Sequence, residues 1–237
     1  MSEVTAAKRP RVEKTIFLVD DHALVRRGLR ALIESEPGLA VVGEAATAAE
    51  ALVAIEDHAP DLVIVDLELE ELDGLDLIKS LKSSHPNVHT LVVSMHDEGV
   101  YAERALRAGA GGYVSKRQLD NSVLVAIHRV LTGETYMSRT LEARLAVKYV
   151  RGQAMETDSP MDVLSDRELQ VFRLIGRGRP NREIAETLHL SVKTVESHRE
   201  HIKQKLQLQS ATELAHRATQ WVAIGRFEPS GPTRLND

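Results

Sequence analysis

Two hydrophobic stretches that end in aspartate decide the fold: Thr15-Ile16-Phe17-Leu18-Val19-Asp20-Asp21 and Leu62-Val63-Ile64-Val65-Asp66. Short, unbroken apolar runs are typical of parallel strands that are buried on both faces. The whole set of predicted strands is 15–20, 39–44, 62–66, 90–94 and 112–115, with amphipathic helix patterns between them. Five strands that alternate with about five helices predict an α/β fold with a doubly wound, five-stranded parallel sheet over residues 14–137.

Polar residues follow the predicted strands at the point where each one ends. Asp20 and Asp21 follow the first strand, Asp66 the third, Ser94 the fourth and Lys116 the fifth. Because ligands bind at the carboxyl ends of parallel strands, these side chains are expected to form one site. An Asp-Asp pair after a strand also suits a helix N-cap or a turn. The presence of all these residues on successive elements favours the site.

Three carboxylates, a hydroxyl and an ammonium have the chemistry to hold Mg²⁺ and a phosphoryl group. Mg²⁺ prefers oxygen ligands, and the candidates are Asp20, Asp21, Asp66 and the backbone carbonyl of Glu68. A carboxylate can also be the nucleophile that forms an aspartyl phosphate, which makes Asp66 the candidate acceptor. Lys116 would pair with the phosphoryl oxygens, and the Ser94 hydroxyl would donate a hydrogen bond to them.

The bulk composition limits the class of protein. The chain has 237 residues, 43% hydrophobic and 27% charged, which is typical of a soluble globular protein of one large or two ordinary domains. It has no apolar run near the ~20 residues that span a bilayer, and residues 1–14 do not resemble a secretory signal. It also has no cysteine, so disulfides and thiolate sites are excluded. These features predict a cytoplasmic protein without a membrane partner.

The C-terminal part of the chain has a different pattern. Residues 138–160 are predicted to be a linker, and residues 161–224 an all-α domain with helices at 166–176, 181–188, 192–206 and 210–223. Ser165 and Glu168 have the spacing of a capping box at the first of these helices, and Ser191 can cap the third. A helix, a short turn and a second helix with polar and basic residues predict a helix-turn-helix, whose second helix would enter the major groove of DNA.

Charge permits DNA binding without requiring it. Residues 162–220 contain ten Lys and Arg against eight Asp and Glu, so this segment carries +2 and the rest of the chain −7. An excess this small leaves open a plain helical bundle with solvated charges.

Two sets of motifs resemble known families. Residues 14–137 resemble the receiver domain of bacterial two-component response regulators, and the whole chain resembles the NarL/FixJ class. The matching receiver residues are Asp20-Asp21, Asp66 in Val-Asp-Leu-x-Leu, Asp73-Gly74, Ser94, Tyr113 and Lys116 in Gly-Tyr-Val-Ser-Lys. Residues 162–223 resemble the LuxR-type helix-turn-helix through Leu-Ser-x-Arg-Glu, Gly-x-x-Asn-x-Glu-Ile-Ala and Leu-x-x-Ser-x-x-Thr-Val-x-x-His.

The resemblance implies a flavodoxin-like receiver whose Asp66 is phosphorylated by a histidine kinase in the presence of Mg²⁺. It also implies that Ser94 and Tyr113 form the switch that reports phosphorylation, and that phosphorylation controls homodimerisation and DNA binding. The chain departs from the family at Leu69-Glu70, where Met-Pro is common. Two rival functions are a phosphohydrolase that passes through an aspartyl phosphate and a regulator that is never phosphorylated. We expect neither of them, and we expect that the protein is not an enzyme.

The chemistry of the residues indicates roles within the helix-turn-helix. Candidate phosphate contacts, which make DNA binding depend on salt, are Arg182, Lys193, Thr194, Lys203 and Lys205. Glu196, Ser197 and Glu200 fall where the family reads bases, and a glutamate can accept from cytosine N4. His198 is either a reader or a structural residue. Val195, Ile202 and Leu206 are expected to face the core.

Overall fold

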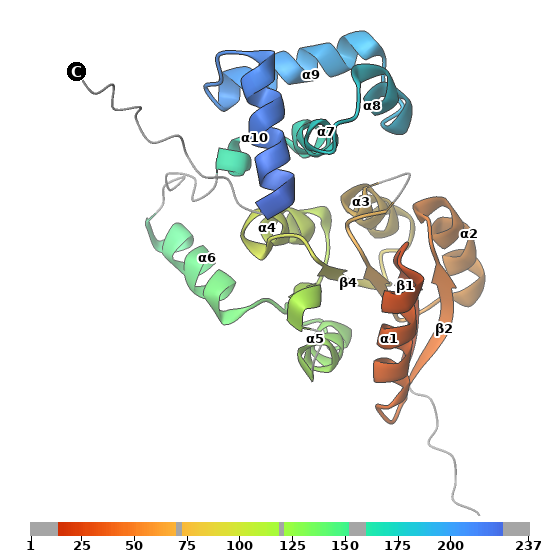
Figure 1. The fold of residues 1–237 in the computed structure, drawn as a ribbon. Helices are drawn as coiled ribbons and strands as arrows, with labels where there is room; N and C mark the ends of the chain where they lie inside the picture. The colour runs from red at the N-terminus through yellow and green to blue at the C-terminus, as the bar shows by residue number, and fades with distance from the viewer. Residues whose placement is uncertain (1–13, 70–72, 119–120, 152–159, 225–237) are drawn as a thin grey trace, which may run out of the picture. The chain divides into compact units, whose positions relative to one another are not determined.

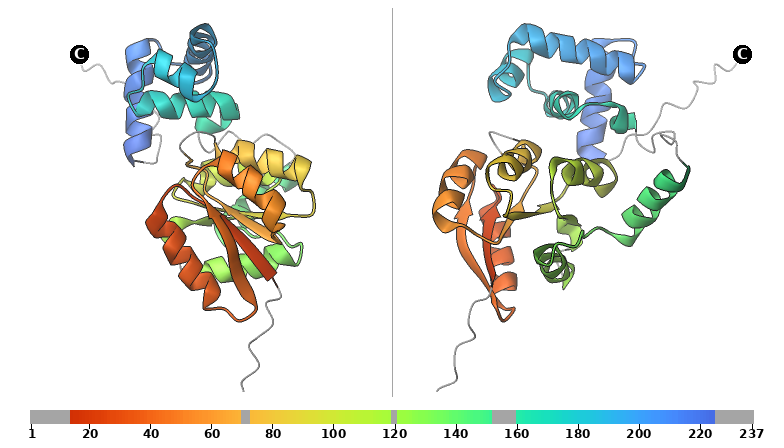
Figure 2. Two further views of the ribbon diagram at one scale, coloured as in Figure 1. Left: turned by 90° about the vertical axis from the view of Figure 1, so that its right-hand side faces the viewer. Right: turned by 180° about the vertical axis from the view of Figure 1, so that it is seen from behind.

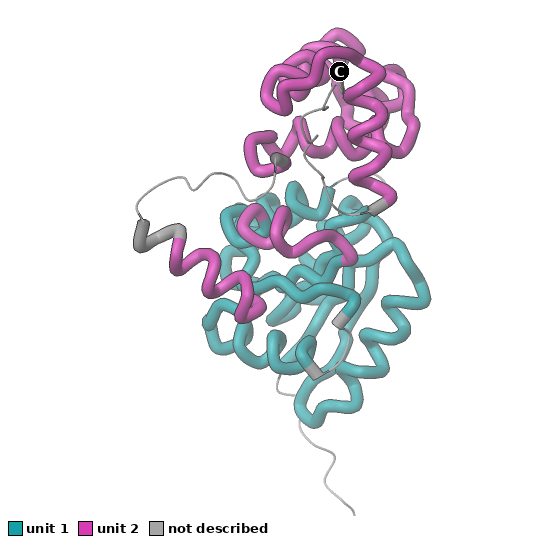
Figure 3. Tube along the Cα trace, turned by 60° about the vertical axis from the view of Figure 1, so that its left-hand side comes forward, with its two compact units in different colours: residues 1–94, 105–136 teal, residues 95–104, 137–237 magenta. Residues whose placement is uncertain are grey.

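A computed structural model describes residues 14–69, 73–118, 121–151 and 160–224 of the chain (Figure 1). The chain divides into two compact units, coloured in Figure 3. Unit 1 takes the residues up to 94 and residues 105–136, and unit 2 takes residues 95–104 and those from 137 onward. None of the helices in the described residues is long and apolar enough to cross a membrane.

The sheet of unit 1 has five parallel strands: β1 (Lys14–Val19), β2 (Leu39–Ala45), β3 (Leu62–Val65), β4 (His89–Ser94) and β5 (Gly112–Ser115). Each observed boundary lies within one residue of the predicted one, which confirms the doubly wound α/β fold. The strand order is β2-β1-β3-β4-β5, so β1 and β3 are neighbours at the centre. Val19 pairs with Val65 in this register, and the aspartates that follow these two residues are thereby placed next to each other.

Helices cover both faces of this sheet (Figure 2). On one face, α1 (Ala23–Glu34) and α5 (Asn121–Leu131) bury alternate strand residues such as Ile16, Ile64 and Val93. The other face carries α2 (Ala48–His58) and α3 (Gly74–Ser84). Because the strands are covered on both sides, their sequences read as continuous apolar runs. The chain also forms α4 (Glu98–Ala108), whose first part belongs to unit 2, and a short 3₁₀ turn, η1 (Lys116–Gln118).

Unit 2 contains α6 (Arg139–Arg151), η2 (Pro160–Val163), α7 (Asp166–Gly176), α8 (Asn181–Thr187), α9 (Val192–Lys205) and α10 (Ala211–Ile224). The last four confirm the predicted helical domain. Their apolar side chains form a common core, with Phe172 and Trp221 ring centroids 5.7 Å apart. Val195 and Ile202 are fully buried as predicted, and Leu206 is half-buried. The helix α6 lies within the predicted linker, and the domain limits 14–137, 138–160 and 161–224 stay a prediction.

Side-chain caps fix where the helices of unit 2 begin. Ser165 Oγ accepts from the backbone N–H of Glu168 (3.3 Å), and Glu168 Oε2 accepts from the N–H of Ser165 (2.7 Å), which confirms the capping box. Ser191 Oγ accepts from the N–H of Thr194 (3.0 Å) at the start of α9. Between α8 and α9, His189 adopts a left-handed φ of 53°, which closes the turn of the helix-turn-helix.

Candidate functional site

The acidic residues predicted from the strand ends do come together. Asp20 and Asp66 are 2% and 3% exposed, and candidate ligand atoms of Asp20, Asp21, His22 and Asp66 all lie within 4.8 Å of one another. The backbone N–H of Asp66 donates to the carbonyl of Val19 (2.8 Å), which continues the β1–β3 ladder to the start of the site. The geometry therefore follows directly from the pairing of the two central strands.

Lys116 joins the two buried carboxylates. Its Nζ lies 2.5 Å from Asp20 Oδ2 and 2.6 Å from Asp66 Oδ2. Lys116 as a whole is 8% exposed. Lys116 follows β5, so its side chain spans from the edge of the sheet to the centre. A buried ammonium shared by two carboxylates offsets part of their repulsion.

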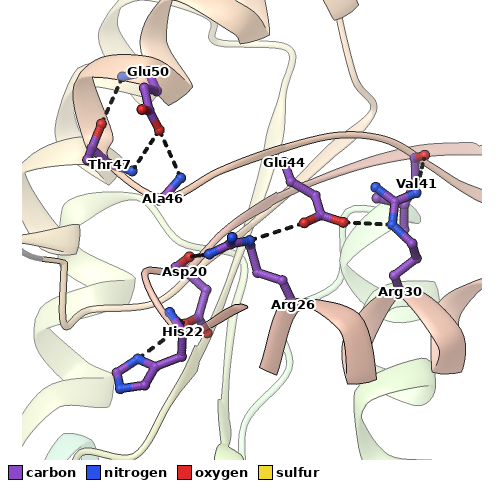
Figure 4. Close-up of polar contacts among 9 residues, drawn as sticks. All are labelled: Asp20, His22, Arg26, Arg30, Val41, Glu44, Ala46, Thr47 and Glu50. Atoms are coloured by element: carbon purple, nitrogen blue, oxygen red, sulfur yellow. Dashed lines mark hydrogen bonds and ion pairs between the residues drawn. The ribbon is translucent and has the colours of Figure 1, made fainter. Parts of the chain in front are cut away.

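The segment after β1 is held by contacts that the sequence did not suggest. The backbone N–H of His22 donates to Asp20 Oδ1 (2.8 Å), and His22 Nδ1 lies 2.5 Å from Asp21 Oδ1. Arg26 donates to the carbonyl of Asp20 and also pairs with Glu44 of β2 (Figure 4). Burial opposes ionisation of Glu44, but hydrogen bonds from Arg30 and Arg26 hold its pKa below the usual value. Arg26 thus connects the Asp20 backbone at the acidic site to the Glu44 carboxylate on β2.

Electrostatics set Asp66 apart from the other aspartates. Burial raises the pKa of the Asp66 carboxyl to about 6, against the opposing charge and hydrogen bond of Lys116. The charge of Asp20 adds to the rise, and a hydrogen bond from Ser94 opposes it. The ionised form of Asp66 is therefore destabilised by its surroundings and gains from any added positive charge.

Two buried carboxylate oxygens of the site, Asp21 Oδ1 and Asp66 Oδ1, have no hydrogen-bond partner among the described residues, although the His22 ring lies beside the first. A buried carboxylate oxygen is ordinarily paired, so an unpaired one indicates a place for a ligand. A hard cation coordinated by carboxylate oxygens satisfies this requirement, and the residues present fit Mg²⁺.

The other predicted receiver residues lie on β4, on β5 and in the segment after β3. Ser94, at the end of β4, is fully buried, and Tyr113 in β5 is 1% exposed. Glu68 is half-buried in the segment after β3, and its carbonyl as a metal ligand stays a prediction. Glu70, at the departure from the family pattern, lies outside the described residues.

Some of the predicted DNA-binding residues of α9 are exposed to solvent, and others are paired with neighbouring side chains. Lys193, Glu196, Ser197 and Glu200 are exposed at i, i+3, i+4 and i+7 and so share one face of the helix. Thr194 is half-buried, and its hydroxyl lies 2.7 Å from that of Ser191 at the N-cap. This face gives the helix a polar, solvated surface.

The remaining candidates are held by other side chains. Lys205 Nζ pairs with Glu168 of α7 (2.7 Å), and Lys203 Nζ with Glu200 (2.9 Å). Arg182 pairs with Glu186 on its own helix (3.2 Å), with 86% of its side chain exposed. His198 is half-buried, and burial lowers its pKa below the usual value. The pair between Lys205 and Glu168 of α7 was not predicted from the sequence.

Comparison with known proteins identifies the class. Residues 16–128 match the response regulator receiver domain, and residues 162–218 match the bacterial regulatory proteins of the luxR family. A receiver joined to a LuxR-type helix-turn-helix defines a DNA-binding response regulator. The chain belongs to the NarL/FixJ family of two-component response regulators, which are transcription regulators rather than enzymes.

Relatives and solved structures agree with this assignment. The chain is 37% identical over 207 residues to the oxygen regulatory protein NreC of Staphylococcus haemolyticus, and 38% to that of Staphylococcus carnosus; each match covers 86% of this chain and 95% of the relative. A LuxR-family response regulator from Aurantimonas sp. SI85-9A1 superposes with a TM-score of 0.54 at 37% identity, over 58% of this chain and 98% of that chain. RcsB from Salmonella enterica serovar Typhimurium, bound to promoter rprA in the presence of phosphomimetic BeF3−, superposes with a TM-score of 0.67 at 25% identity, over 86% and 97%.

Proposed function

We propose that Asp66 is the phosphoacceptor of this response regulator and that a sensor histidine kinase supplies the phosphoryl group. One observation carries the proposal: the buried Asp66 carboxylate has an unpaired oxygen, with the Lys116 ammonium 2.6 Å from its other oxygen. The carboxylate is thus held in place by one oxygen while the second is available to react. Aspartates such as Asp61, which is bonded to Lys14 and Thr15, lack this arrangement.

In the transfer, an Asp66 oxygen attacks phosphorus and forms the acyl phosphate as the bond to the donor nitrogen breaks. The electron pair of that bond returns to the donor imidazole. Lys116 then pairs with the phosphoryl oxygens, and the Ser94 hydroxyl donates a hydrogen bond to one of them. Since such transfers depend mainly on positioning and charge neutralisation, the rigid strand ends contribute by fixing the acceptor.

Mg²⁺ is the metal proposed for this site. Asp20, Asp21 and Asp66 would hold it through carboxylate oxygens, together with the carbonyl of Glu68. When bound, it supplies positive charge that neutralises the developing charge on the phosphoryl group. Receiver domains typically hold Mg²⁺ in an acidic pocket of this kind.

Intact-mass spectrometry tests the acceptor. Wild-type protein incubated with acetyl phosphate and Mg²⁺ is expected to gain one phosphoryl group, which hydroxylamine removes because the product is an acyl phosphate. Asp66→Asn is expected to gain none. Asp57→Asn, an exposed aspartate on α2, is the matched control and is expected to behave as wild type. Equal labelling of Asp66→Asn, or a label that resists hydroxylamine, contradicts the proposal.

The second part of the proposal is that α9 is the recognition helix. Its exposed face would meet the major groove, with Lys193 and Thr194 near phosphates and Glu196, Ser197 and Glu200 near base edges. Arg182, Lys203 and Lys205 would add phosphate contacts once they leave their carboxylate partners, and His198 is assigned a structural role because its Nδ1 is buried. RcsB from Salmonella enterica serovar Typhimurium, 25% identical to this chain, was solved bound to promoter DNA, which supports DNA binding by this protein.

Phosphorylation is proposed to promote a homodimer that binds promoter DNA in the cytoplasm. The receiver would extend over residues 14–137, the linker over 138–160 and the DNA-binding domain over 161–224. Ser94 and Tyr113 would pass the signal, since Ser94 is buried at the end of β4, the neighbour of β3, and Tyr113 is buried in β5, the next strand. With acetyl phosphate, sedimentation should show a higher mass for wild type and an unchanged mass for Asp66→Asn. Equal masses for the two proteins would contradict the coupling.

A further inference from the structure

A second cluster of metal-ligating groups lies in the helical domain, away from the acidic site. Glu168 of α7 and His198 and His201 of α9 each offer one ligand atom, and these atoms lie within 4.8 Å of one another. The two histidines are three residues apart and therefore project from the same side of α9. Glu168 reaches the cluster from the first turn of α7, so the group joins two helices.

Two of these side chains are prepared for coordination. His198 Nδ1 is buried and accepts no hydrogen bond from the described residues, so this nitrogen is open to another partner. Burial lowers the pKa of His198, which favours the neutral imidazole that metals require. Hydrogen bonds from Lys205 and Ser165 overcome the effect of burial and hold the pKa of Glu168 below its usual value, so its carboxylate is ionised.

The carboxylate is also oriented. Glu168 is 4% exposed, and its Oε2 accepts from the Ser165 N–H and from Lys205 Nζ, both at 2.7 Å. Hydrogen bonds that aim a ligand in this way are the usual surroundings of a metal site. His201 is exposed, so its ring is free to turn toward the other two groups.

We propose that Glu168, His198 and His201 form a site for one divalent transition-metal ion, with Zn²⁺ as the best match. Two imidazoles and a carboxylate suit this class of ion, whereas Mg²⁺ prefers all-oxygen ligands. Zn²⁺ bonds of about 2.0–2.1 Å place tetrahedral ligands roughly 3.4 Å apart. The ligand atoms lie within 4.8 Å of one another, so they approach by at most about 1.4 Å on binding. The exposed His201 supplies that movement.

Lys205 is the internal competitor for this site. Its ammonium occupies Glu168 Oε2, where it repels an incoming cation. A bound metal would weaken this pair and leave the ammonium available to a DNA phosphate, a consequence that rests on the function proposed above. Removing Lys205 should therefore strengthen metal binding, in contrast to the loss of a ligand.

Equilibrium dialysis of untagged, full-length protein against Zn²⁺, with Mg²⁺ in excess to occupy the acidic site, measures the uptake without DNA or a phosphodonor. Wild type is expected to bind one more zinc per chain than His201→Asn, whose residual affinity is lower by more than about tenfold. Lys205→Gln is expected to bind zinc more tightly than wild type. His216→Asn, which alters an exposed histidine of α10, is the matched control and should leave uptake unchanged.

His22→Asn separates this site from the acidic one, because His22 adjoins Asp20, Asp21 and Asp66. If His22→Asn removes the zinc and His201→Asn does not, the proposal is overturned. It is also overturned if His201→Asn takes up as much zinc as wild type, as the control His216→Asn is expected to do. Neither result bears on whether Asp66 accepts a phosphoryl group.

Discussion

The acidic site of the receiver and the exposed surface of the helix-turn-helix use charged residues under opposite constraints. Asp20, Asp66 and Lys116 are at most 8% exposed, and contacts of 2.5 and 2.6 Å join these residues, which follow β1, β3 and β5. On the helix-turn-helix, Arg182 is 86% exposed and pairs with Glu186, four residues away on the same helix. The first arrangement is imposed by the fold, and the second is local and easily exchanged.

This difference predicts which property a substitution should change in each region: stability, chemistry or DNA binding. A buried pair experiences a low dielectric, so a change at the acidic site alters both the stability of the receiver and its chemistry. An exposed pair contributes roughly 0–1 kcal/mol, so changes on the exposed face of α9 should leave the stability nearly unchanged and alter the interaction with DNA. Four substitutions, taken from the largest expected effect on stability to the smallest, test this division.

Gly74→Ala should have the largest effect. A Cβ at Gly74 would lie 2.2 Å from the Asp66 carbonyl oxygen and 2.7 Å from Leu67 Cα, so it would push the acceptor segment away from α3. Since both contacts are with backbone, we expect a loss of about 3 kcal/mol or more in the free energy of unfolding, together with loss of phosphoryl uptake. Urea unfolding followed by far-UV circular dichroism measures the first.

Gly28→Ala is the control for this prediction. Gly28 lies inside α1, and a Cβ there would meet no atom within 4 Å. Alanine should therefore stabilise the helix by about 0.5–1 kcal/mol. Equal effects of the two substitutions would show that the close approach at Gly74 is not a constraint on the acceptor segment.

Asp66→Asn should stabilise the protein at neutral pH. The folded pKa of about 6 lies above the ordinary 3.8, so the folded state binds the proton more tightly and wild type loses stability as the pH rises between these values. Asparagine removes that loss, by on the order of 1–3 kcal/mol without Mg²⁺. The gain should be small near pH 4 and greatest above about pH 7.

Thermal unfolding of both proteins across this pH range, with Asp57→Asn as the baseline, measures the gain. Mg²⁺ should raise the midpoint of wild type more than that of Asp66→Asn, because only wild type supplies the third carboxylate. A gain that is the same at every pH would mean that the Asp66 charge is not the cause of the stability difference.

Much of this site could be predicted from the sequence because strand ends are local signals. The apolar runs before Asp20 and Asp66 mark parallel strands, and parallel strands end at one edge of the sheet. The contacts of His22 and Arg26 could not be found in this way. They depend on how α1 leaves the sheet and on Glu44 in the neighbouring strand, and neither has a local signature.

In the helical domain, the capping box and all four helices were predicted, whereas the pair between Lys205 and Glu168 was not. These residues are 37 positions apart, and the register that joins them is set by the packing of α9 on α7. Periodicity assigns a residue to a helix face but not to a partner on another helix. For the same reason, Lys205 was expected only to contact phosphate.

Ser165→Ala should have an intermediate effect. It removes the hydroxyl that accepts from the Glu168 N–H at the start of α7, so we expect a loss of about 1 kcal/mol. The fluorescence of Trp221, the single tryptophan of the chain, follows urea unfolding of this domain. Ser197→Ala is the control, since its hydroxyl donates to the Lys193 carbonyl inside α9 and caps no helix. If Ser197→Ala lost as much free energy of unfolding as Ser165→Ala, the N-cap hydrogen bond would not explain the effect.

Lys193→Ala should have the smallest effect on stability and the clearest effect on DNA. The side chain is exposed in the first turn of α9, so the free energy of unfolding should change by less than about 0.5 kcal/mol. If Lys193 neutralises one phosphate, the dependence of log affinity on log salt should become shallower by about 1, and binding to a random-sequence duplex should weaken. Lys79→Ala, an exposed lysine of α3, controls for the loss of one positive charge. Equal salt dependence in both variants would mean that net charge, rather than this face of α9, governs DNA binding, and the contrast between the two regions would then fail for the helix-turn-helix.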